Sequence, residues 1–268
     1  MPNFAPHPVE VFIGGHAETG YAHVQAGTPC EDSFAWHKNP AVAAAVVGDG
    51  LGGYPEGDKA SALVTTGYAN AIRDMSRTSM GPQELAVAGM EGAHRAIRQE
   101  KVRGQLHRKA ASTIVANLVD LRTGTFYFGW AGDSGLHYLN EKEGRLDLLT
   151  QGHSEGVVMT NTYTGNRAKA QWEGHVMPRY NTTPDVVRLV LASDGLDRLR
   201  QRRDMRVANG TRPDMAKVNA RITDAISLRN APTPHEAAYN LVHASAANTI
   251  KAGWADDTTV VVMDIYRK

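Results

Sequence analysis

Residues 41–53 read AVAAAVVGDGLGG, a continuous apolar run that stops at Asp49 and continues into glycines. A run of this length, without alternation, is typical of a strand buried on both faces. A carboxylate at its end lies at the rim of a sheet, where solvent or a metal ion can reach it. Asp-Gly is also ordinary turn chemistry, so this motif alone leaves both interpretations open.

Three further aspartates stand at the ends of apolar runs. They are Asp133 in FYFGWAGDSG, Asp194 in VVRLVLASDGL and Asp256 in GWADDTTVVVMDI. Strand ends that meet at one rim would bring these carboxylates together, and carboxylate oxygens suit hard divalent cations such as Mg²⁺ and Mn²⁺. The four motifs together therefore favour a metal site over four unrelated turns.

The ordered motifs ED, GDGLGG, GDSG, LASDGL and ADDTTVVV resemble those of metal-dependent protein phosphatases of the protein phosphatase 2C type, in a bacterial-like variant. The resemblance extends from about Gly14 to Ile265. It implies an α+β fold, a four-layer αββα sandwich of two antiparallel sheets flanked by helices. It also implies hydrolysis of phosphoserine and phosphothreonine in proteins by a metal-activated hydroxide.

The resemblance assigns the catalytic metal ligands to Asp49, Asp194 and Asp256. Asp49 would bridge two Mg²⁺ or Mn²⁺ ions, and the carbonyl of Gly50 would be a further ligand. Asp256 is preferred over Asp257 because the family has Asp-Asn at this point, which puts Asp257 in the Asn place.

Three more acidic residues have implied roles. Glu31 and Asp32 match the acidic pair that holds metal-bound waters rather than the ions. Asp133 matches an aspartate that holds a possible third ion in bacterial members, and its alternative is a turn residue after a strand.

The expected phosphate-binding arginine is missing. Counting back from Glu31 and Asp32 puts Gly27 in its place, whereas a short insertion would put His23 there. An imidazolium binds phosphate more weakly than a guanidinium and only below its pKa. His23 as a half-buried strand residue is the open alternative.

Other departures from the family pattern concern substrate binding and proton transfer. Leu51 stands where relatives often carry a histidine that acts as a general acid, Gly135 replaces an arginine, and Gly152 replaces an aspartate. The missing arginine favours a second hypothesis, a catalytically weak phosphoprotein-binding or regulatory module that keeps the fold. The complete aspartate set favours the enzyme, because carboxylates grouped without cations repel one another.

The composition of the chain argues against some classes of binding partner. Lys and Arg number 29 against 28 Asp and Glu, a formal charge of +1 that gives no field for nucleic acid. The N-terminus lacks signal-peptide features, and no apolar run approaches the roughly 20 residues of a membrane span. A single cysteine, Cys30, fits a reducing compartment. We expect a cytoplasmic monomer that acts on phosphoproteins, opposing a Ser/Thr kinase, without nucleic acid or membrane.

Because its aspartates span most of the chain, we expect a single domain over 1–268, with a flap beside the active site at 154–184. Helical spacing predicts helices at 58–75, 82–103 and 231–250, the last one capped by Thr233 with Pro234 at its first position. Apolar runs predict strands at 9–13, 33–36, 41–47, 113–119, 125–130, 186–192 and 258–265.

Overall fold

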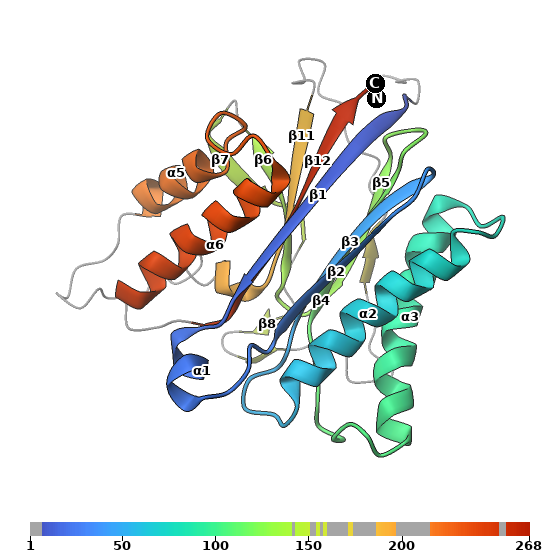
Figure 1. Ribbon diagram of the computed structural model, residues 1–268, viewed down its shortest axis with the longest axis vertical. Helices are drawn as coiled ribbons and strands as arrows, with labels where there is room; N and C mark the ends of the chain where they lie inside the picture. Colours follow the sequence, from blue (N-terminus) through green and yellow to red (C-terminus); the bar gives the residue numbers. More distant parts are fainter. Residues whose placement is uncertain are drawn as a thin grey trace.

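The computed structural model describes residues 7–140, 143–150, 154–155, 158–159, 171–173, 186–196, 215–251 and 256–268. Two five-stranded antiparallel sheets pack face to face, and helices cover their outer faces, as Figure 1 shows. The chain therefore has the predicted αββα layers.

The first sheet has the strand order β1-β12-β11-β6-β7. Its strands are β1 (Val9–Glu18), β12 (Thr258–Arg267), β11 (Val186–Ala192), β6 (Gly135–Asn140) and β7 (Arg145–Leu148). The first and last described strands of the chain are thus neighbours, paired from Val9 with Arg267 to Glu18 with Thr258.

The second sheet has the strand order β10-β5-β4-β3-β2. Its strands are β10 (Gln171–Glu173), β5 (Phe126–Ala131), β4 (Ile114–Asp120), β3 (Val42–Asp49) and β2 (Asp32–Lys38). A small separate hairpin joins β8 (Ser154–Glu155) to β9 (Val158–Met159).

Helices form the two outer layers. Helices α2 (Gly57–Met75) and α3 (Pro82–Val102) cover the second sheet, while α5 (Met215–Ala225) and α6 (Pro234–Lys251) cover the first. A short helix, α1 (Tyr21–Ala26), lies between β1 and β2 in the chain. Among the described residues, no helix is both long and apolar enough to cross a membrane.

The continuous apolar run of β3 is explained by burial on both faces. Val46 packs toward α2 and α3, whereas Val47 packs between the two sheets with Trp130 and Val261. Both valines are completely buried. Because adjacent strand residues point to opposite faces, a strand enclosed on both sides needs apolar residues at every position.

Helix α6 begins as predicted. Its cap, Thr233, has a side-chain oxygen that accepts the N–H of Glu236 at 3.2 Å, and the Glu236 carboxylate accepts the Thr233 N–H at 3.1 Å. This reciprocal pair satisfies free donors at the helix start. The predicted helices and strands are all present, but β1 continues to Glu18, five residues past its predicted end. The other ends differ by at most three residues.

Several elements were not predicted. Strands β6 and β7 are short, and α1 has only six residues. Helix α5 was missed although Met215, Val218 and Ile222 recur at helical spacing. The structure also buries Arg188 on β11. Its guanidinium forms two 2.6 Å bonds with Asp264 and donates to the carbonyls of Ile226 and Ala231. This arginine thereby ties the α5–α6 connection to the sheet.

Apart from β8, β9 and β10, the predicted flap at 154–184 lies outside the described residues.

Candidate metal centre

Three of the predicted aspartates meet at one end of the two sheets. Asp49 ends β3, Asp133 lies between β5 and β6 where the chain passes from one sheet to the other, and Asp194 follows β11. One carboxylate oxygen from each lies within 4.8 Å of the others. Asp133 therefore does more than occupy a turn, because its carboxylate faces those of two other strand ends.

Thr113 connects two of these strand ends. Its hydroxyl accepts the N–H of Asp49 at 3.0 Å, and its own N–H donates to the Asp49 carbonyl at 2.8 Å. The same hydroxyl lies 2.6 Å from the hydroxyl of Ser134, the neighbour of Asp133. Gly132 has a φ of +102°, and a Cβ there would lie 2.7 Å from Thr113. The turn that carries Asp133 consequently requires glycine.

Gly50 is enclosed by backbone. Its N–H donates to the carbonyl of Glu31 at 2.9 Å, and an added Cβ would lie 2.3 Å from the carbonyl oxygen of Gly57. A side chain at this position would push the start of α2 away from the end of β3. This glycine therefore lets the strand end and the helix start approach each other.

The site concentrates negative charge in a buried place. Burial raises the pKa of Asp49 well above its usual range, and the charges of Asp32, Asp194, Asp256 and Asp133 raise it further. No cationic side chain is among these causes. The four neighbouring carboxylates thus lie close enough to Asp49 to repel its charge.

Asp32 lies directly opposite Asp49 in the pairing of β2 with β3. Burial raises its pKa to about 8, Asp257 and Asp194 also raise it, and the hydroxyls of Ser193 and Thr259 offset part of the effect. Among the described residues, neither Asp32 oxygen has a partner with hydrogen-bond geometry. Buried carboxylate oxygens whose only nearby donors are two hydroxyls outside good hydrogen-bond geometry fit divalent cations and their waters, so the carboxylate set is suitable for Mg²⁺ or Mn²⁺.

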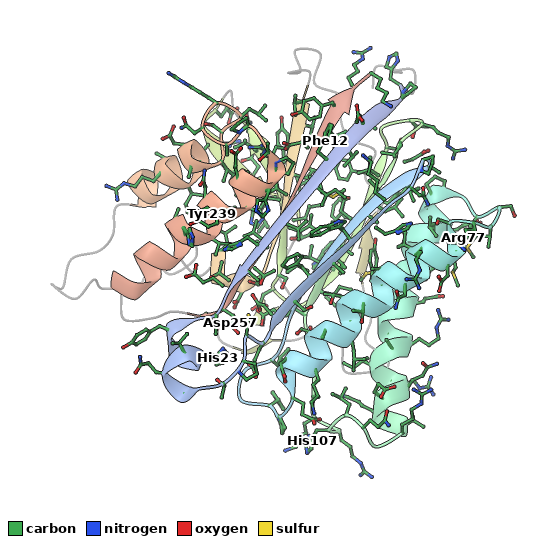
Figure 2. The ribbon with its side chains drawn as sticks, viewed as in Figure 1. Phe12, His23, Arg77, His107, Tyr239 and Asp257 are labelled. Carbon is green, nitrogen blue, oxygen red and sulfur yellow. The ribbon has the colours of Figure 1, made fainter. Side chains whose placement is uncertain are left out.

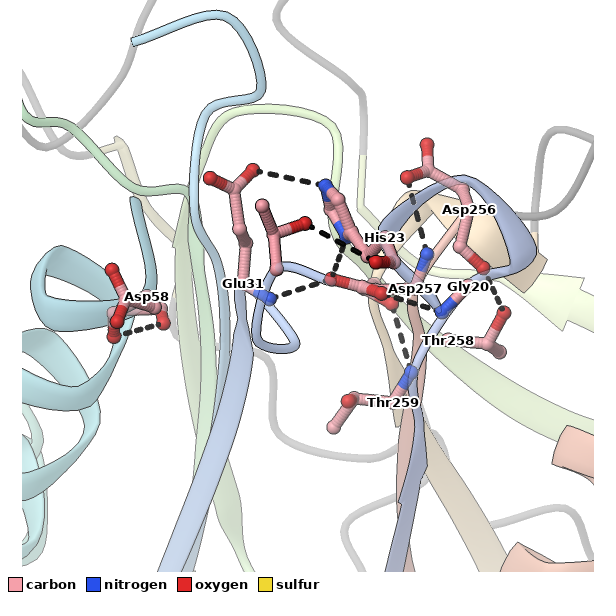
Figure 3. A network of polar contacts seen from close by, with 11 residues as sticks. Gly20, His23, Glu31, Asp58, Asp256, Asp257, Thr258 and Thr259 are labelled. Atoms are coloured by element: carbon pink, nitrogen blue, oxygen red, sulfur yellow. Dashed lines mark hydrogen bonds and ion pairs between the residues drawn. The ribbon is translucent and has the colours of Figure 1, made fainter. Parts of the chain in front are cut away.

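The adjacent residues Asp256 and Asp257 have different surroundings, which Figure 3 shows. Asp257 is buried, and its carboxylate accepts the N–H of Gly20 at 2.6 Å and that of Glu31 at 2.5 Å. It also binds the Nδ1 atom of His23 at 2.8 Å. The charge of Asp256 acts on Asp49, and its carboxylate accepts the N–H of Asp257 at 3.1 Å. Asp257 is thus occupied with chain contacts, whereas Asp256 lies near the acidic group.

His23 lies on helix α1 rather than on a strand, beside Asp257 in Figure 2. Its Nε2 atom is 3.7 Å from the carboxylate of Glu31. Burial lowers the pKa of His23, but the hydrogen bond and charge of Asp257, together with Glu31 and Asp256, outweigh this and raise it. Burial raises the pKa of Glu31, and His23 opposes that change. The imidazole is therefore held in its charged form more than a free histidine is.

The positions that depart from the family pattern have structural explanations in two cases. Gly27 caps α1 with a φ of +66°, a conformation that an arginine would adopt only with strain. Gly135 is buried at the start of β6. Leu51 follows Gly50 and is half-buried. Gly152 lies outside the described residues.

Residues 19–228 match the model of the family described as Protein phosphatase 2C, and the chain belongs to this family. No curated protein matches the chain in sequence. Solved structures with the same fold include the catalytic domain of the serine/threonine phosphatase PstP in complex with two manganese ions. It is 20% identical, has a TM-score of 0.64, and the match covers 96% of this chain and 99% of that chain.

Two further solved structures are similar. The serine/threonine phosphatase of S. agalactiae is 19% identical with a TM-score of 0.69, and the match covers 97% of this chain and 100% of that chain. The phosphatase MsPP from Mycobacterium smegmatis, in complex with cacodylate, is 20% identical with a TM-score of 0.62. That match covers 94% of this chain and 97% of MsPP.

The adjacent residues Asp256 and Asp257 should contribute differently to the stability of the fold. Asp257→Ala leaves the N–H groups of Gly20 and Glu31 without an acceptor, so we expect the free energy of unfolding to fall by about 2–4 kcal/mol. The matched variant Asp256→Ala should change it by less than about 1 kcal/mol. Denaturant unfolding in the presence of chelator measures both, and equal losses would contradict these different surroundings.

The metal-free protein should lose stability as the pH rises. Asp32 and Asp49 have folded pKa values above the unfolded value of about 3.9, so the unfolded chain binds fewer protons than the folded chain between that pH and their folded values. In chelator, the free energy of unfolding should therefore fall from about pH 4 toward pH 8. Asp49→Asn should flatten this slope relative to the parent protein, while Asp147→Asn on β7 should not. Parallel slopes for both variants would show that the acidic group is not repulsive.

Proposed function

We propose that this chain is a metal-dependent serine/threonine protein phosphatase, a phosphoric monoester hydrolase. The observation that carries the proposal is the meeting of Asp49, Asp133 and Asp194 at one end of the sandwich, in a chain of the protein phosphatase 2C family. Like charges at this separation are unfavourable unless cations neutralise them, so the arrangement has a use that a turn residue does not explain.

Asp49, Asp194 and Asp256 would hold two Mg²⁺ or Mn²⁺ ions, with the carbonyl of Gly50 as a further ligand. Asp133, whose oxygen lies near those of Asp49 and Asp194, would hold a third. Such ions, when bound, neutralise the phosphoryl oxygens and lower the pKa of a water molecule toward neutrality. The carboxylates supply these positions from different strands, so their spacing is fixed by the sheets.

Glu31 and Asp32 would orient the waters of the site. The carboxylate oxygens of Asp32 are buried beside the acidic group, and the backbone N–H of Glu31 is fixed by Asp257. Because the Glu31 side chain also lies beside His23, its position depends on the charge of the imidazole. The two residues can therefore accept protons from water without themselves being placed as metal ligands.

His23 would provide the positive charge for the substrate phosphate. Its Nδ1 atom is bound to Asp257, which leaves Nε2 as the atom directed toward an anion in competition with Glu31. The raised pKa of His23 supports this role, because an imidazolium donates charge-assisted hydrogen bonds to phosphate. Asp257 would thus position a cation that replaces the missing arginine.

The proposed substrate is a phosphorylated protein in the cytoplasm, opposing a Ser/Thr kinase, and the proposed active form is a monomer of one domain. Support comes from the family and from solved relatives whose titles call them serine/threonine phosphatases. One relative with the same fold, PppA, is described as a regulatory component of T6SS in Pseudomonas aeruginosa.

Activity should depend on the metal and on its ligands. Hydrolysis of an aryl phosphate should require Mn²⁺ or Mg²⁺ and disappear in chelator. Asp49→Asn and Asp256→Asn should each lower kcat by roughly 100-fold or more, because they remove charge that binds the ions rather than packing.

The control for this experiment is Asp147→Asn, which removes a carboxylate from β7, the edge strand of the first sheet, and should leave kcat unchanged. Turnover of a phosphorylated peptide should follow the same pattern. Full activity in chelator would contradict the enzyme, and binding of the phosphopeptide without turnover would support a phosphoprotein-binding module instead.

Replacing His23 should affect substrate binding more than turnover. We expect His23→Ala to raise KM several-fold with a smaller effect on kcat, and His23→Arg to restore KM because guanidinium stays charged. KM of the parent protein should rise as the pH increases through the pKa of His23, which lies above 6.5. A KM that is flat with pH and unaffected by His23→Ala would remove this residue from the phosphate site.

A further inference from the structure

A second group of metal-binding side chains lies outside the acidic centre. His16 and Glu18 on β1 and His243 on α6 each offer one ligand atom, and these atoms all lie within 4.8 Å of one another. The group consists of two imidazoles and one carboxylate, whereas the acidic centre offers only carboxylates. The two groups therefore have different ligand chemistry.

The register of β1 explains why its two residues point to the same side. Val11 and Ile13 face the space between the sheets, so the alternate positions, from Gly14 onward, face α6. A Cβ on Gly14 would lie 2.3 Å from the backbone N of His235 at the helix start. This close approach brings α6 against β1 and presents His16 and Glu18 to the helix.

Residues four apart on α6 complete the group. Tyr239 and His243 lie on one face of the helix, and their rings pack edge to face with centroids 3.9 Å apart. His16 contacts both rings, at 5.1 Å from Tyr239 and 5.6 Å from His243. In Figure 2, Tyr239 lies on α6 beside β1. Aromatic contacts thus limit the rotation of both imidazoles.

We propose that His16, Glu18 and His243 form a binding site for a d-block divalent cation such as Zn²⁺, separate from the acidic centre and joining α6 to β1. The Nδ1 atom of His243 and a Glu18 oxygen form a hydrogen bond of 3.0 Å, and a bound cation would take the place of the shared proton. This separation is close to the roughly 3.3 Å between ligands around tetrahedral zinc. The side chains of Glu18 and His243 are each 41% exposed, so solvent can supply the fourth ligand.

The ligand set discriminates between cations. Imidazole nitrogen favours zinc and other late first-row metals, whereas Mg²⁺ prefers oxygen and keeps its waters. Neutral imidazole is the form of histidine that binds a metal ion, so zinc binding at this site should weaken as the pH falls and the imidazoles take up protons.

A cation at this site would connect two parts of the chain that are far apart in sequence. Glu18 is the last residue of β1, and two residues later the N–H of Gly20 donates to Asp257. Fixing the end of β1 to α6 therefore also fixes the start of the segment that carries His23. The proposal concerns binding and does not depend on the proposed phosphatase activity.

The test is calorimetric titration of Zn²⁺ into the protein in excess Mg²⁺, which occupies the acidic centre. We expect one zinc equivalent in the parent protein and in Asp49→Asn. His16→Gln and His243→Gln should each lower the affinity for zinc by about tenfold or more. Even partners outside the ligand shell affect metal affinity to this extent. The matched control is His94→Gln, a half-buried histidine on α3, which should bind zinc as the parent does.

Histidine NMR and thermal unfolding give two further measurements. Zinc should shift the imidazole signals of His16 and His243 and leave that of His94 unchanged, and it should raise the Tm of the parent protein but not of the His16→Gln, His243→Gln double variant. The proposal is overturned if the parent takes up no zinc in excess Mg²⁺, or if the double variant retains the equivalent. Loss of the equivalent in Asp49→Asn alone would place the zinc in the acidic centre and would equally overturn it.

Discussion

The burial of several like charges at one end of a sheet sandwich is the constraint on which this structure depends. Asp32 and Asp49 face each other on paired strands, and the charges of Asp133, Asp194 and Asp256 act on the same place. Each additional carboxylate raises the cost of ionising the others. A fold that keeps them together is therefore less stable without cations than with them, and cation binding to the folded state alone offsets that cost.

Other buried aspartates of this protein show what a structural carboxylate looks like. Asp264 is bonded to both guanidinium nitrogens that face it from Arg188, and Asp257 accepts two backbone N–H groups and a histidine nitrogen. Their charges are balanced by donors within the chain. The pKa of Asp49, in contrast, is raised mainly by burial and by the charges of neighbouring carboxylates, which is why we propose it as a metal ligand.

Asp257 also shows how one residue can connect the two sheets at the site. It lies before β12 of the first sheet, and it holds the N–H of Glu31, which precedes β2 of the second. Its hydrogen bond and charge raise the pKa of His23, in the segment between β1 and β2. The family resemblance places a neutral Asn here, and in this chain the aspartate is paired with the histidine.

The sequence by itself determined the layers and the rim aspartates, because burial on both faces demands the continuous apolar runs of β3, β11 and β12, and because each run stops or starts at an acidic residue. The local sequence also predicted where α6 begins, because Thr233 caps the helix through a contact with Glu236, only three residues away. Only the tertiary structure decided the partners of Arg188, the separate surroundings of Asp256 and Asp257, and the helical position of His23. It also brought His16 and Glu18 against His243. The contacts of Arg188, of His23 with Asp257 and of Glu18 with His243 join residues 38 to 234 positions apart. No local pattern specifies them, because they depend on which strands and helices become neighbours in the folded chain.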